Sequence, residues 1–217
     1  MLIAAIAKGR PINLHSPERK HRAAVLLGAP GTGKGTHGRA IGTLPGFHHC
    51  ACGDVFRSMD LDSEVGRVFR EYSSRGDLVP DEFTVRLWRD YIRGMELLGR
   101  FNPSRDLLVL DGIPRSARQA ALLDDAVEVV AVINLVCSDL SSLVARMRSR
   151  ALHSNRLDDA SESVIRHRLE VYQRETAPVL AHFDPGIIVD VDASQSPLNV
   201  LADTAASIAE RTSAVPA

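Results

Sequence analysis

The chain has 217 residues, of which 45% are hydrophobic and 24% are charged, so it is long enough for one sizeable core with small insertions. Its formal net charge is -1, so it lacks the overall positive field with which proteins hold a nucleic-acid backbone. No apolar run approaches the roughly 20 residues that span a bilayer. The sequence therefore predicts a protein that binds neither nucleic acid nor membranes.

The first 22 residues are predicted to form an extension ahead of the domain. They carry five basic side chains against the single acid Glu18, and the apolar run LIAAIA is too short even for a signal-peptide core. Pro11 and Pro17 disfavour a continuous helix in this segment. We expect a short surface extension and a cytoplasmic protein, with an organellar presequence as the alternative.

Short β-rich runs alternate with longer helical patterns through the rest of the chain, which is typical of a parallel sheet covered by helices on both faces. The predicted strands are residues 23–28, 47–52, 106–112, 127–137 and 186–192. Apolar residues at three- and four-residue spacing predict helices over residues 81–98, 138–150, 161–183 and 198–211. Asp159 with Glu162 resembles an acidic capping box, and Ser196 before Pro197 indicates another helix start.

The stretch GAPGTGKGT, residues 28–36, follows the first predicted strand directly. Its glycines permit backbone angles and close approach that a side chain would block, so successive N–H groups are free to point at a phosphate. Lys34 adds a cation, and Thr36 adds a hydroxyl for Mg²⁺ one place later than the general pattern has it. From residue 21 onward Lys34 is the only lysine, which favours a phosphate-binding loop over an incidental turn.

The three cysteines, Cys50, Cys52 and Cys137, lie in strand-like runs and are odd in number. A disulfide framework is therefore disfavoured, and reduced thiols fit a cytoplasmic setting. Cys50 and Cys52 have no second cysteine pair or histidine cluster that would complete four metal ligands. A zinc site is accordingly not predicted.

The glycine-rich loop, with Pro30 and its Gly35-Thr36 ending, closely resembles the phosphate loop of nucleoside monophosphate kinases, and of adenylate kinases in particular. Four further stretches resemble motifs of that family in the same order: GDVFR (53–57), GDLVPD (76–81), DGIPRSARQ (111–119) and SNRLDD (154–159). The resemblance covers about residues 23–213. Residues 150–160 contain no quartet of Cys or His that could bind zinc. The chain therefore resembles the members of the family with a short lid, which bind no zinc.

The resemblance implies a P-loop NTPase-type domain over residues 23–217, with a five-stranded parallel sheet and helices on both of its faces. It also implies a helical insert near residues 51–80 that binds the acceptor, and a short lid near residues 149–160. The implied protein is a monomer whose substrates are ATP and AMP, and whose cofactor is the Mg²⁺ that accompanies ATP. Its reaction would be MgATP + AMP ⇌ 2 ADP.

On the donor side, the resemblance implies that the loop and one arginine, which stacks on the adenine, bind ATP. These residues are Gly28, Ala29, Pro30, Gly31, Thr32, Gly33, Lys34, Gly35, Thr36 and Arg146. Thr36 and Asp111 would hold Mg²⁺, Asp111 through water. The implied catalytic residues are Lys34, Arg115, Arg150, Arg156 and Arg168. Without the resemblance, the arginine-rich run near the lid indicates only a solvated helix face paired with nearby acids.

On the acceptor side, the implied AMP-binding residues are Cys52, Gly53, Arg57, Gly76, Leu78, Val79, Gly112, Arg115 and Gln119. Arg57 and Arg115 would grip the monophosphate, because a forked guanidinium suits phosphate better than an ammonium does. Gln119 would pair with adenine, since its amide offers both a donor and an acceptor.

Three features depart from the family pattern: Cys52 stands where a Thr or Ser is usual, His37 stands where a Gln is usual, and the stretch ALHSN between Arg150 and Arg156 lacks the glycines that are typical of short lids. The alternatives to an adenylate kinase are a UMP/CMP-type kinase and a nucleotide-binding module with weak turnover. A Ras-type GTPase is excluded, because no lysine after Lys34 is present to build the Asn-Lys-x-Asp segment that reads guanine.

Overall fold

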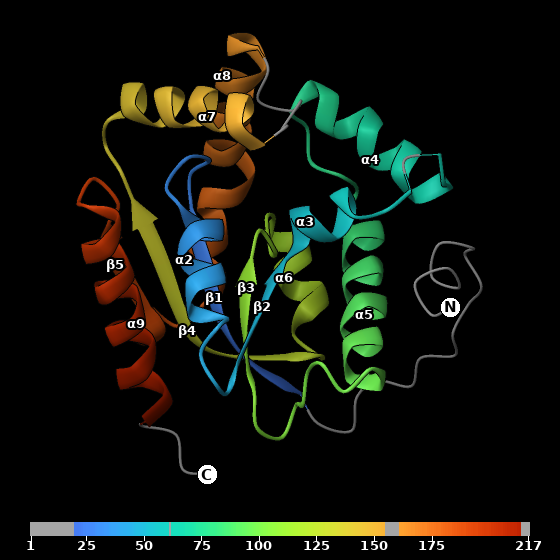
Figure 1. The fold of residues 1–217 in the computed structure, drawn as a ribbon, viewed down its shortest axis with the longest axis vertical. Helices are drawn as coiled ribbons and strands as arrows, with labels where there is room; N and C mark the ends of the chain where they lie inside the picture. The colour runs from blue at the N-terminus through green and yellow to red at the C-terminus, as the bar shows by residue number, and fades with distance from the viewer. Residues whose placement is uncertain (1–19, 61, 155–160, 214–217) are drawn as a thin grey trace.

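In a computed structural model, which describes residues 20–60, 62–154 and 161–213, the core is a parallel sheet of five strands. The strands are β1 (His21–Gly28), β2 (Phe47–Ala51), β3 (Leu107–Asp111), β4 (Val127–Val136) and β5 (Ile188–Asp192). Their order across the sheet is β2-β3-β1-β4-β5, and every neighbouring pair runs parallel (Figure 1). The predicted α/β fold class is confirmed.

The sheet buries both of its faces, and β1 shows how its sequence achieves this. Residues Ala23 to Leu27 are all at most 3% exposed. Successive side chains of a strand point to opposite faces, so this burial means that both faces of the strand are covered. Ala23, Val25 and Leu27 belong to one apolar cluster, whereas Ala24 and Leu26 belong to another on the opposite face. A strand buried on both sides has a continuous apolar run instead of an alternating one, as AAVLL does.

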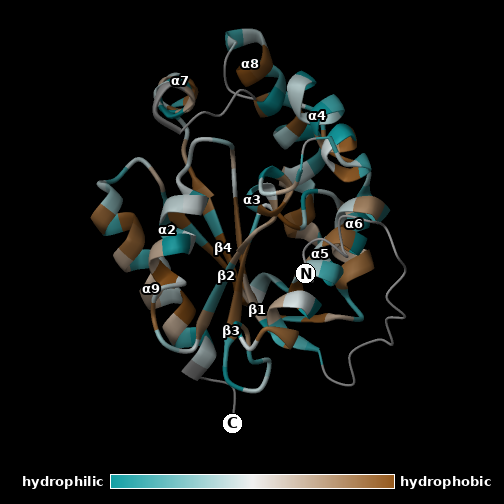
Figure 2. Ribbon diagram, turned by 45° about the vertical axis from the view of Figure 1, so that its right-hand side comes forward, coloured by the Kyte–Doolittle hydropathy of each residue, from teal (hydrophilic) through white to brown (hydrophobic). Residues whose placement is uncertain are grey.

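Helices pack against both faces of the sheet and also lie above the carboxyl ends of its strands. They are α2 (Lys34–Ile41), α3 (Cys52–Arg57), α4 (Glu64–Arg75), α5 (Asp81–Leu97), α6 (Ala117–Leu123), α7 (Leu140–Ser154), α8 (Glu162–Val171) and α9 (Pro197–Ser213). Helices α2 and α9 cover one face and α5 and α6 the other, each turning apolar residues toward the strands (Figures 1 and 2). Within the described residues, no helix is both long and apolar enough to cross a membrane.

The predicted strand positions are right, and their ends differ by one or two residues. β1 begins at His21, two residues early and inside the segment that was expected to be an extension. Cys52, predicted as the end of the second strand, is instead the first residue of α3. Cys137 lies one residue beyond the end of β4, and all three cysteines are free thiols, as predicted.

The single helix predicted over residues 161–183 is wrong. α8 ends at Val171 and is followed by a π-helical turn, η2 (Tyr172–Thr176), and a 3₁₀ segment, η3 (Ala177–His182). Pro178 has no N–H to donate and its ring crowds the preceding turn, so a regular α-helix cannot continue through it. The wider turn ahead of the proline directs Tyr172 and Thr176 into a large cavity beside the glycine-rich loop.

The two predicted helix starts have different outcomes. Asp159 lies outside the described residues, and the side-chain cap of α8 is Ser161, whose hydroxyl accepts a hydrogen bond from the Val164 N–H at 3.2 Å. The start of α9 is confirmed: Pro197 is its first residue, and the Ser196 hydroxyl accepts from the Asn199 N–H at 3.2 Å.

The carboxyl ends of the strands lie at one edge of the sheet, beneath α4, α7 and α8 (Figure 1). The chain leaves β1 toward β2 on one side of it, whereas β3 connects to β4 on the other side. In open parallel sheets such a reversal of winding leaves a crevice at the carboxyl edge, where ligands bind. The glycine-rich loop after β1 lies at this crevice.

Candidate active site

The loop from Gly28 to Gly33 joins β1 to α2 with a positive φ at three positions, Gly28, Gly31 and Gly33, where glycine is favoured. Gly33, immediately before α2, has a φ of 98°, in the left-handed region. A Cβ on Gly28, whose φ is 136°, would lie 2.6 Å from the carbonyl oxygen of Leu135 on β4. The loop therefore begins close against β4, at a place where a side chain on Gly28 would not fit.

Lys34 is the first residue of α2, and its side chain folds back over the loop. Its Nζ donates to the carbonyl oxygens of Gly28, at 2.6 Å, and Ala29, at 3.0 Å. Burial lowers the pKa of Lys34 to about 8, and Asp111 opposes that shift while Arg115, Arg150 and Arg168 add to it. The loop lysine thus lines the same cavity as three of the arginines that were predicted to be catalytic, and their charges act on it.

The lowered pKa of Lys34 predicts that stability depends on pH in a defined window. Below about pH 8 the lysine is charged in both states, and the folded state bears the cost of burying that charge. Between about 8 and its ordinary value of 10.5 the folded chain has lost the proton and the unfolded chain keeps it. The free energy of unfolding should therefore rise with pH through this window, by up to roughly 3 kcal/mol from this group.

Urea unfolding of the ligand-free protein at several pH values, beside Lys34→Met, measures this rise. Titration of the cysteines and tyrosines is common to both proteins, so it cancels in their difference. We expect the stability of the wild type relative to Lys34→Met to increase from pH 8 to 10.5. Two parallel curves would show that Lys34 keeps its ordinary pKa in the folded protein.

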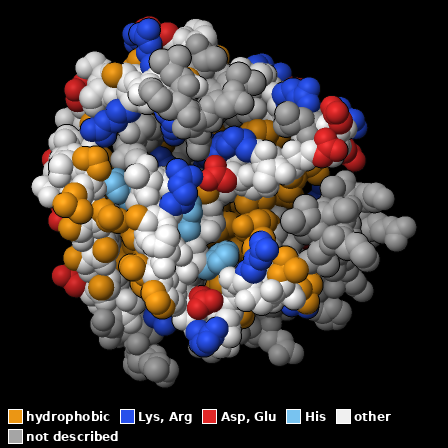
Figure 3. All heavy atoms as spheres, in the orientation of Figure 1, with side chains coloured by type: hydrophobic (Ala, Val, Ile, Leu, Met, Phe, Trp, Pro, Cys, Tyr) orange, Lys and Arg blue, Asp and Glu red, His pale blue; other side chains and the backbone are white. Residues whose placement is uncertain are grey.

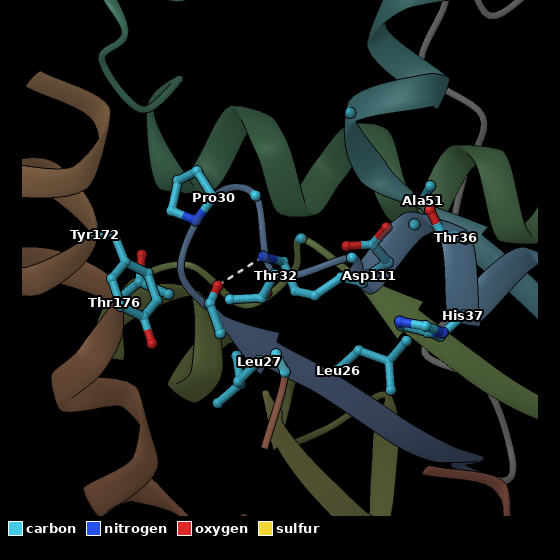
Figure 4. Close-up of a pocket in the computed structure, with 18 of the residues that line it drawn as sticks. Leu26, Leu27, Pro30, Thr32, Thr36, His37, Ala51, Asp111, Tyr172 and Thr176 are labelled. Carbon is cyan, nitrogen blue, oxygen red and sulfur yellow. Dashed lines mark hydrogen bonds between the residues drawn. The ribbon is translucent and has the colours of Figure 1, made fainter. Parts of the chain in front are cut away.

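Asp111 ends β3 and lies beside the start of α2, next to Thr36 and Ala51 (Figure 4). Its Oδ2 lies 3.1 Å from the position that a Cβ on Gly35 would take. Burial alone would raise the pKa of Asp111, but the His49 imidazole, 3.8 Å away, and the charge of Lys34 outweigh it and lower the pKa. The carboxylate is therefore ionised at neutral pH, and it faces the loop.

The oxygens of Asp111 and Thr36 suit a magnesium ion better than a metal that only protein side chains hold. Within the described ranges, no group of three or more His, Cys, Asp or Glu side chains is placed to hold a metal ion. One ionised carboxylate and the Thr36 hydroxyl at the cavity wall match an ion that keeps several waters and takes further ligands from phosphates. Asp111 and Thr36 therefore fit a Mg²⁺ that arrives with a nucleotide.

A cavity of about 500 Å³ opens beside the loop, bounded by α7, α8 and the start of α9. All of the predicted ATP-binding residues line it except Ala29, and Tyr172 and Thr176 lie across the loop from Asp111 (Figure 4). A second cavity of about 70 Å³ is lined by the predicted acceptor residues. The residues that line both cavities are Gly53, Arg57, Gly76, Leu78, Gly112, Arg115 and Arg168.

Arg115 lies where the two cavities meet, in a turn that holds it through both backbone and side chain. Its Nε donates to the Gly112 carbonyl oxygen at 2.9 Å, and its own carbonyl oxygen accepts from the Thr176 hydroxyl at 2.8 Å. Gly112 has a φ of 74°, and a Cβ there would lie 2.7 Å from the Arg115 guanidinium. The guanidinium is thereby directed toward both cavities.

The other predicted arginines lie around the same space, and Figure 3 shows basic side chains near the middle and the top of this face. Arg146 and Arg150 come from α7, and Arg146 donates to the Ala193 carbonyl oxygen at 3.0 Å. Arg168 comes from α8, and its Cγ lies 2.8 Å from the position of a Cβ on Gly76. Arg156 lies outside the described residues, as does most of the predicted lid.

Arg57 belongs to a cluster that the sequence interpretation recognised only in part. Its guanidinium donates to the carboxylate of Asp54, which also accepts from Arg39 at 3.2 Å. Arg39 and Asp54 both line the large cavity, and neither was predicted to be a site residue. Asp54 lies inside the quoted GDVFR motif, whereas nothing in the spacing of Arg39 distinguishes it from a surface arginine.

Gln119 and Cys52 are both buried in the wall of the smaller cavity, which Val79 also lines. Gln119 is 1% exposed, and its amide contacts the Arg115 backbone and the Asp81 carboxylate. Burial raises the pKa of the Cys52 thiol to about 11, against the lowering effect of Arg115 and Arg57. Cys52 therefore presents a neutral thiol, a weak hydrogen-bonding group, to this cavity.

Comparison with known proteins agrees with this geometry. The sequence model of the adenylate kinase family matches residues 26–187. The adenylate kinase of Kocuria rhizophila is 38% identical over 77% of this chain and 88% of that protein. Those of Thermobifida fusca (36%, 78% of this chain and 88% of that protein) and Flavobacterium psychrophilum (33%, 73% and 83%) are also similar. The glycine-rich loop, its lysine and several arginines lie at the carboxyl edge of a parallel sheet. With this geometry, and matched over this length, the chain belongs to the adenylate kinase family.

Proposed function

We propose that the chain catalyses reversible, Mg²⁺-dependent transfer of a phosphoryl group from ATP to AMP, giving two ADP. The observation that carries this proposal is a pair of cavities that share seven lining residues, one cavity along the phosphate loop and one around Gln119, with Arg115 in the wall of both. Two nucleotides bound there would bring their phosphates together at the arginines. Membership of the adenylate kinase family supports the same substrates.

On the donor side, we propose that residues 28–36 wrap the phosphates of ATP. Lys34, which bonds to loop carbonyls, would move to the β and γ oxygens when the nucleotide enters. Arg146, in the wall of the large cavity, would stack on the adenine. Thr36 and Asp111 would hold Mg²⁺, Asp111 through water, and the bound ion would neutralise charge on the β and γ phosphates.

On the acceptor side, Arg57 and Arg115 would grip the monophosphate, because both line the two cavities at their junction. The remaining predicted acceptor residues form the wall of the smaller cavity: Cys52, Gly53, Gly76, Leu78, Val79, Gly112 and Gln119. Gln119 would read the adenine edge through its amide. The neutral Cys52 thiol would replace the hydroxyl contact that is usual at this position with a weaker one.

The chemical step requires positioning and charge neutralisation rather than a base. An oxygen of the dianionic monophosphate attacks the γ-phosphorus, the bond from that phosphorus to the bridging oxygen breaks, and the leaving ADP keeps the electron pair. No proton is transferred, so Lys34, Arg115, Arg150 and Arg168 would act by offsetting the charge on the transferring group. Arg156 would join them from the lid.

The same proposal assigns the parts of the chain. We assign the kinase domain to residues 23–217, extended to His21 because β1 begins there. The acceptor insert lies near residues 51–80. The lid near residues 149–160 would close over the phosphates and exclude water. The rest of the predicted extension, residues 1–22, would precede the domain. We propose a monomeric cytoplasmic enzyme that serves nucleotide biosynthesis.

An acceptor panel tests the function. Purified protein with MgATP is given AMP, dAMP, GMP, CMP or UMP separately, and ADP formation is followed by chromatography. We expect AMP to be strongly preferred over GMP, CMP and UMP, since a purine bearing an amino group at position 6 matches the amide of Gln119. Lys34→Ala, purified in parallel, shows how much activity comes from contaminating host kinase.

Each other outcome of the panel has a defined meaning. Preference for CMP or UMP would make the chain a pyrimidine monophosphate kinase. Nucleotide binding without turnover of any acceptor would make it a binding module, and Cys52 would be the first residue to restore to Thr.

A further inference from the structure

The amide of Gln119 has two fixed neighbours inside the protein. Its Oε1 accepts a hydrogen bond from the Arg115 N–H at 2.7 Å, and its Nε2 donates to Asp81 Oδ1 at 2.9 Å. Gln119 is the third residue of α6, 1% exposed, and its own N–H donates to the Ser116 hydroxyl at 3.0 Å. Asp81 is the first residue of α5, so the contact joins two helices that pack together on one face of the sheet.

These neighbours decide which way the amide faces. A carboxylate only accepts hydrogen bonds, so the amide nitrogen must face Asp81, and a backbone N–H only donates, so the amide oxygen must face Arg115. With the amide turned over, two acceptors would meet at Asp81 and two donors at Arg115. Both mismatches would lie in a buried place, where an unmade hydrogen bond is expensive.

The amide retains part of its hydrogen-bonding capacity for a ligand. The amide oxygen and the amide nitrogen each have two hydrogen-bonding positions, and the protein uses one on each atom. One lone pair of Oε1 and one N–H of Nε2 therefore remain. Gln119 lines the smaller cavity, where these groups are available to a base. An oxygen acceptor beside a nitrogen donor matches a 6-aminopurine, whose amino group donates and whose N1 accepts. A 6-oxopurine presents the reverse pattern.

We propose that Asp81 is a positioning residue that determines acceptor specificity. Its carboxylate, together with the Arg115 N–H, holds Gln119 in the one orientation that accepts AMP and rejects a 6-oxopurine monophosphate. This inference rests on the proposed function, in which Gln119 reads the acceptor base. It assigns a role to a residue that touches no substrate and lies 38 positions from the side chain on which it acts.

The test compares kcat/KM for AMP and for inosine monophosphate (IMP) in the wild type and in Asp81→Asn. Asparagine has nearly the same shape, but its amide donates as readily as it accepts, so it no longer enforces one orientation. We expect the AMP-to-IMP ratio to fall about tenfold, mainly through a higher KM for AMP, with the KM for ATP unchanged. A merely structural role would lower activity with both acceptors equally.

Glu82→Gln is the matched control. Glu82 is the next residue along α5, and its carboxylate also bridges to α6, through Arg118 Nε at 3.0 Å, without contacting Gln119. It should leave the AMP-to-IMP ratio unchanged. If Asp81→Asn fails to fold, Asp81→Ser, whose hydroxyl both donates and accepts at a helix start, is assayed in the same way.

A double-mutant cycle shows whether Asp81 acts through Gln119. In a Gln119→Ala background, Asp81→Asn should change the ratio less than about twofold. An equal effect in both backgrounds, or an unchanged ratio in Asp81→Asn alone, overturns the inference and leaves the kinase function standing. A wild type that does not prefer AMP overturns both together, so the two failures are distinguishable.

Discussion

Replacing Lys34 with alanine is expected to lower kcat about a thousandfold while the protein stays folded. Lys34 supplies a cation at the loop, within the influence of Arg115, Arg150 and Arg168. Its lowered pKa reflects burial without a phosphate beside it, and the negative charge of a bound nucleotide would favour the protonated form. An interaction that strengthens as charge develops on the transferring phosphoryl group contributes to kcat more than to binding.

The fold should survive this change because the strands and helices around the loop do not depend on the ammonium group. The substitution removes two hydrogen bonds to the carbonyls of Gly28 and Ala29, and the Ala29 carbonyl oxygen keeps the N–H and hydroxyl of Thr32 as donors. Circular dichroism and thermal unfolding check the fold, and initial-rate kinetics with MgATP and AMP give kcat. Lys20→Ala, at an exposed lysine, is the matched control. A Lys34→Ala protein with kcat within tenfold of the wild type would show that the loop acts through its backbone alone.

The sheet was predictable from the sequence because a buried parallel strand carries its signal in a few consecutive residues. AAVLL and LLVL are apolar, short and bounded by turn residues, and both lie in strands that are almost wholly buried. The last residue of a strand depends instead on the direction that the chain takes next. Cys52 continues the composition of β2, but the chain turns into α3 there, and no local pattern distinguishes the last residue of a strand from the first of a helix.

The phosphate loop was predictable for a similar reason: its function depends on the backbone shape of consecutive residues. Contacts between remote segments were not. Thr176 was expected in the interior of a long helix, and only the widened turn ahead of Pro178 brings its hydroxyl to the Arg115 carbonyl oxygen, 61 positions away. The proline is visible in the sequence, but the sequence pattern does not predict which side chain the altered turn will direct toward the site.

The acceptor site shows the same limit for side chains whose residue type is common. Gln119 was identified through its motif, yet its orientation depends on Asp81, to which the sequence pattern assigned no role beyond ending GDLVPD and starting a predicted helix. Arg39 joins the site because α2 turns its guanidinium toward Asp54. One arginine among many on a helix has no signal of its own, since charged helix faces are usually solvated.

Replacing Arg115 with alanine is expected to lower kcat/KM for AMP about a thousandfold, through both a lower kcat and a higher KM. Its guanidinium lines both cavities, so it would contact the acceptor phosphate before the reaction and the transferring group during it. The backbone bonds from Arg115 to Gln119 and Thr176 do not involve the side chain and should persist. The loss is therefore confined to the guanidinium. Steady-state kinetics with AMP and MgATP varied separately measure it.

Two further variants separate geometry from charge. Arg118→Ala, three residues along on an exposed face with Glu82 as its partner, should leave kcat and both KM values nearly unchanged. Arg115→Lys keeps the charge but loses the fork of donors that matches two phosphate oxygens at once, so it should recover only part of the activity. Full activity in Arg115→Lys would mean that a point charge suffices at the junction, and the bidentate grip on the acceptor would then have to be made by Arg57, which Asp54 holds in the same wall.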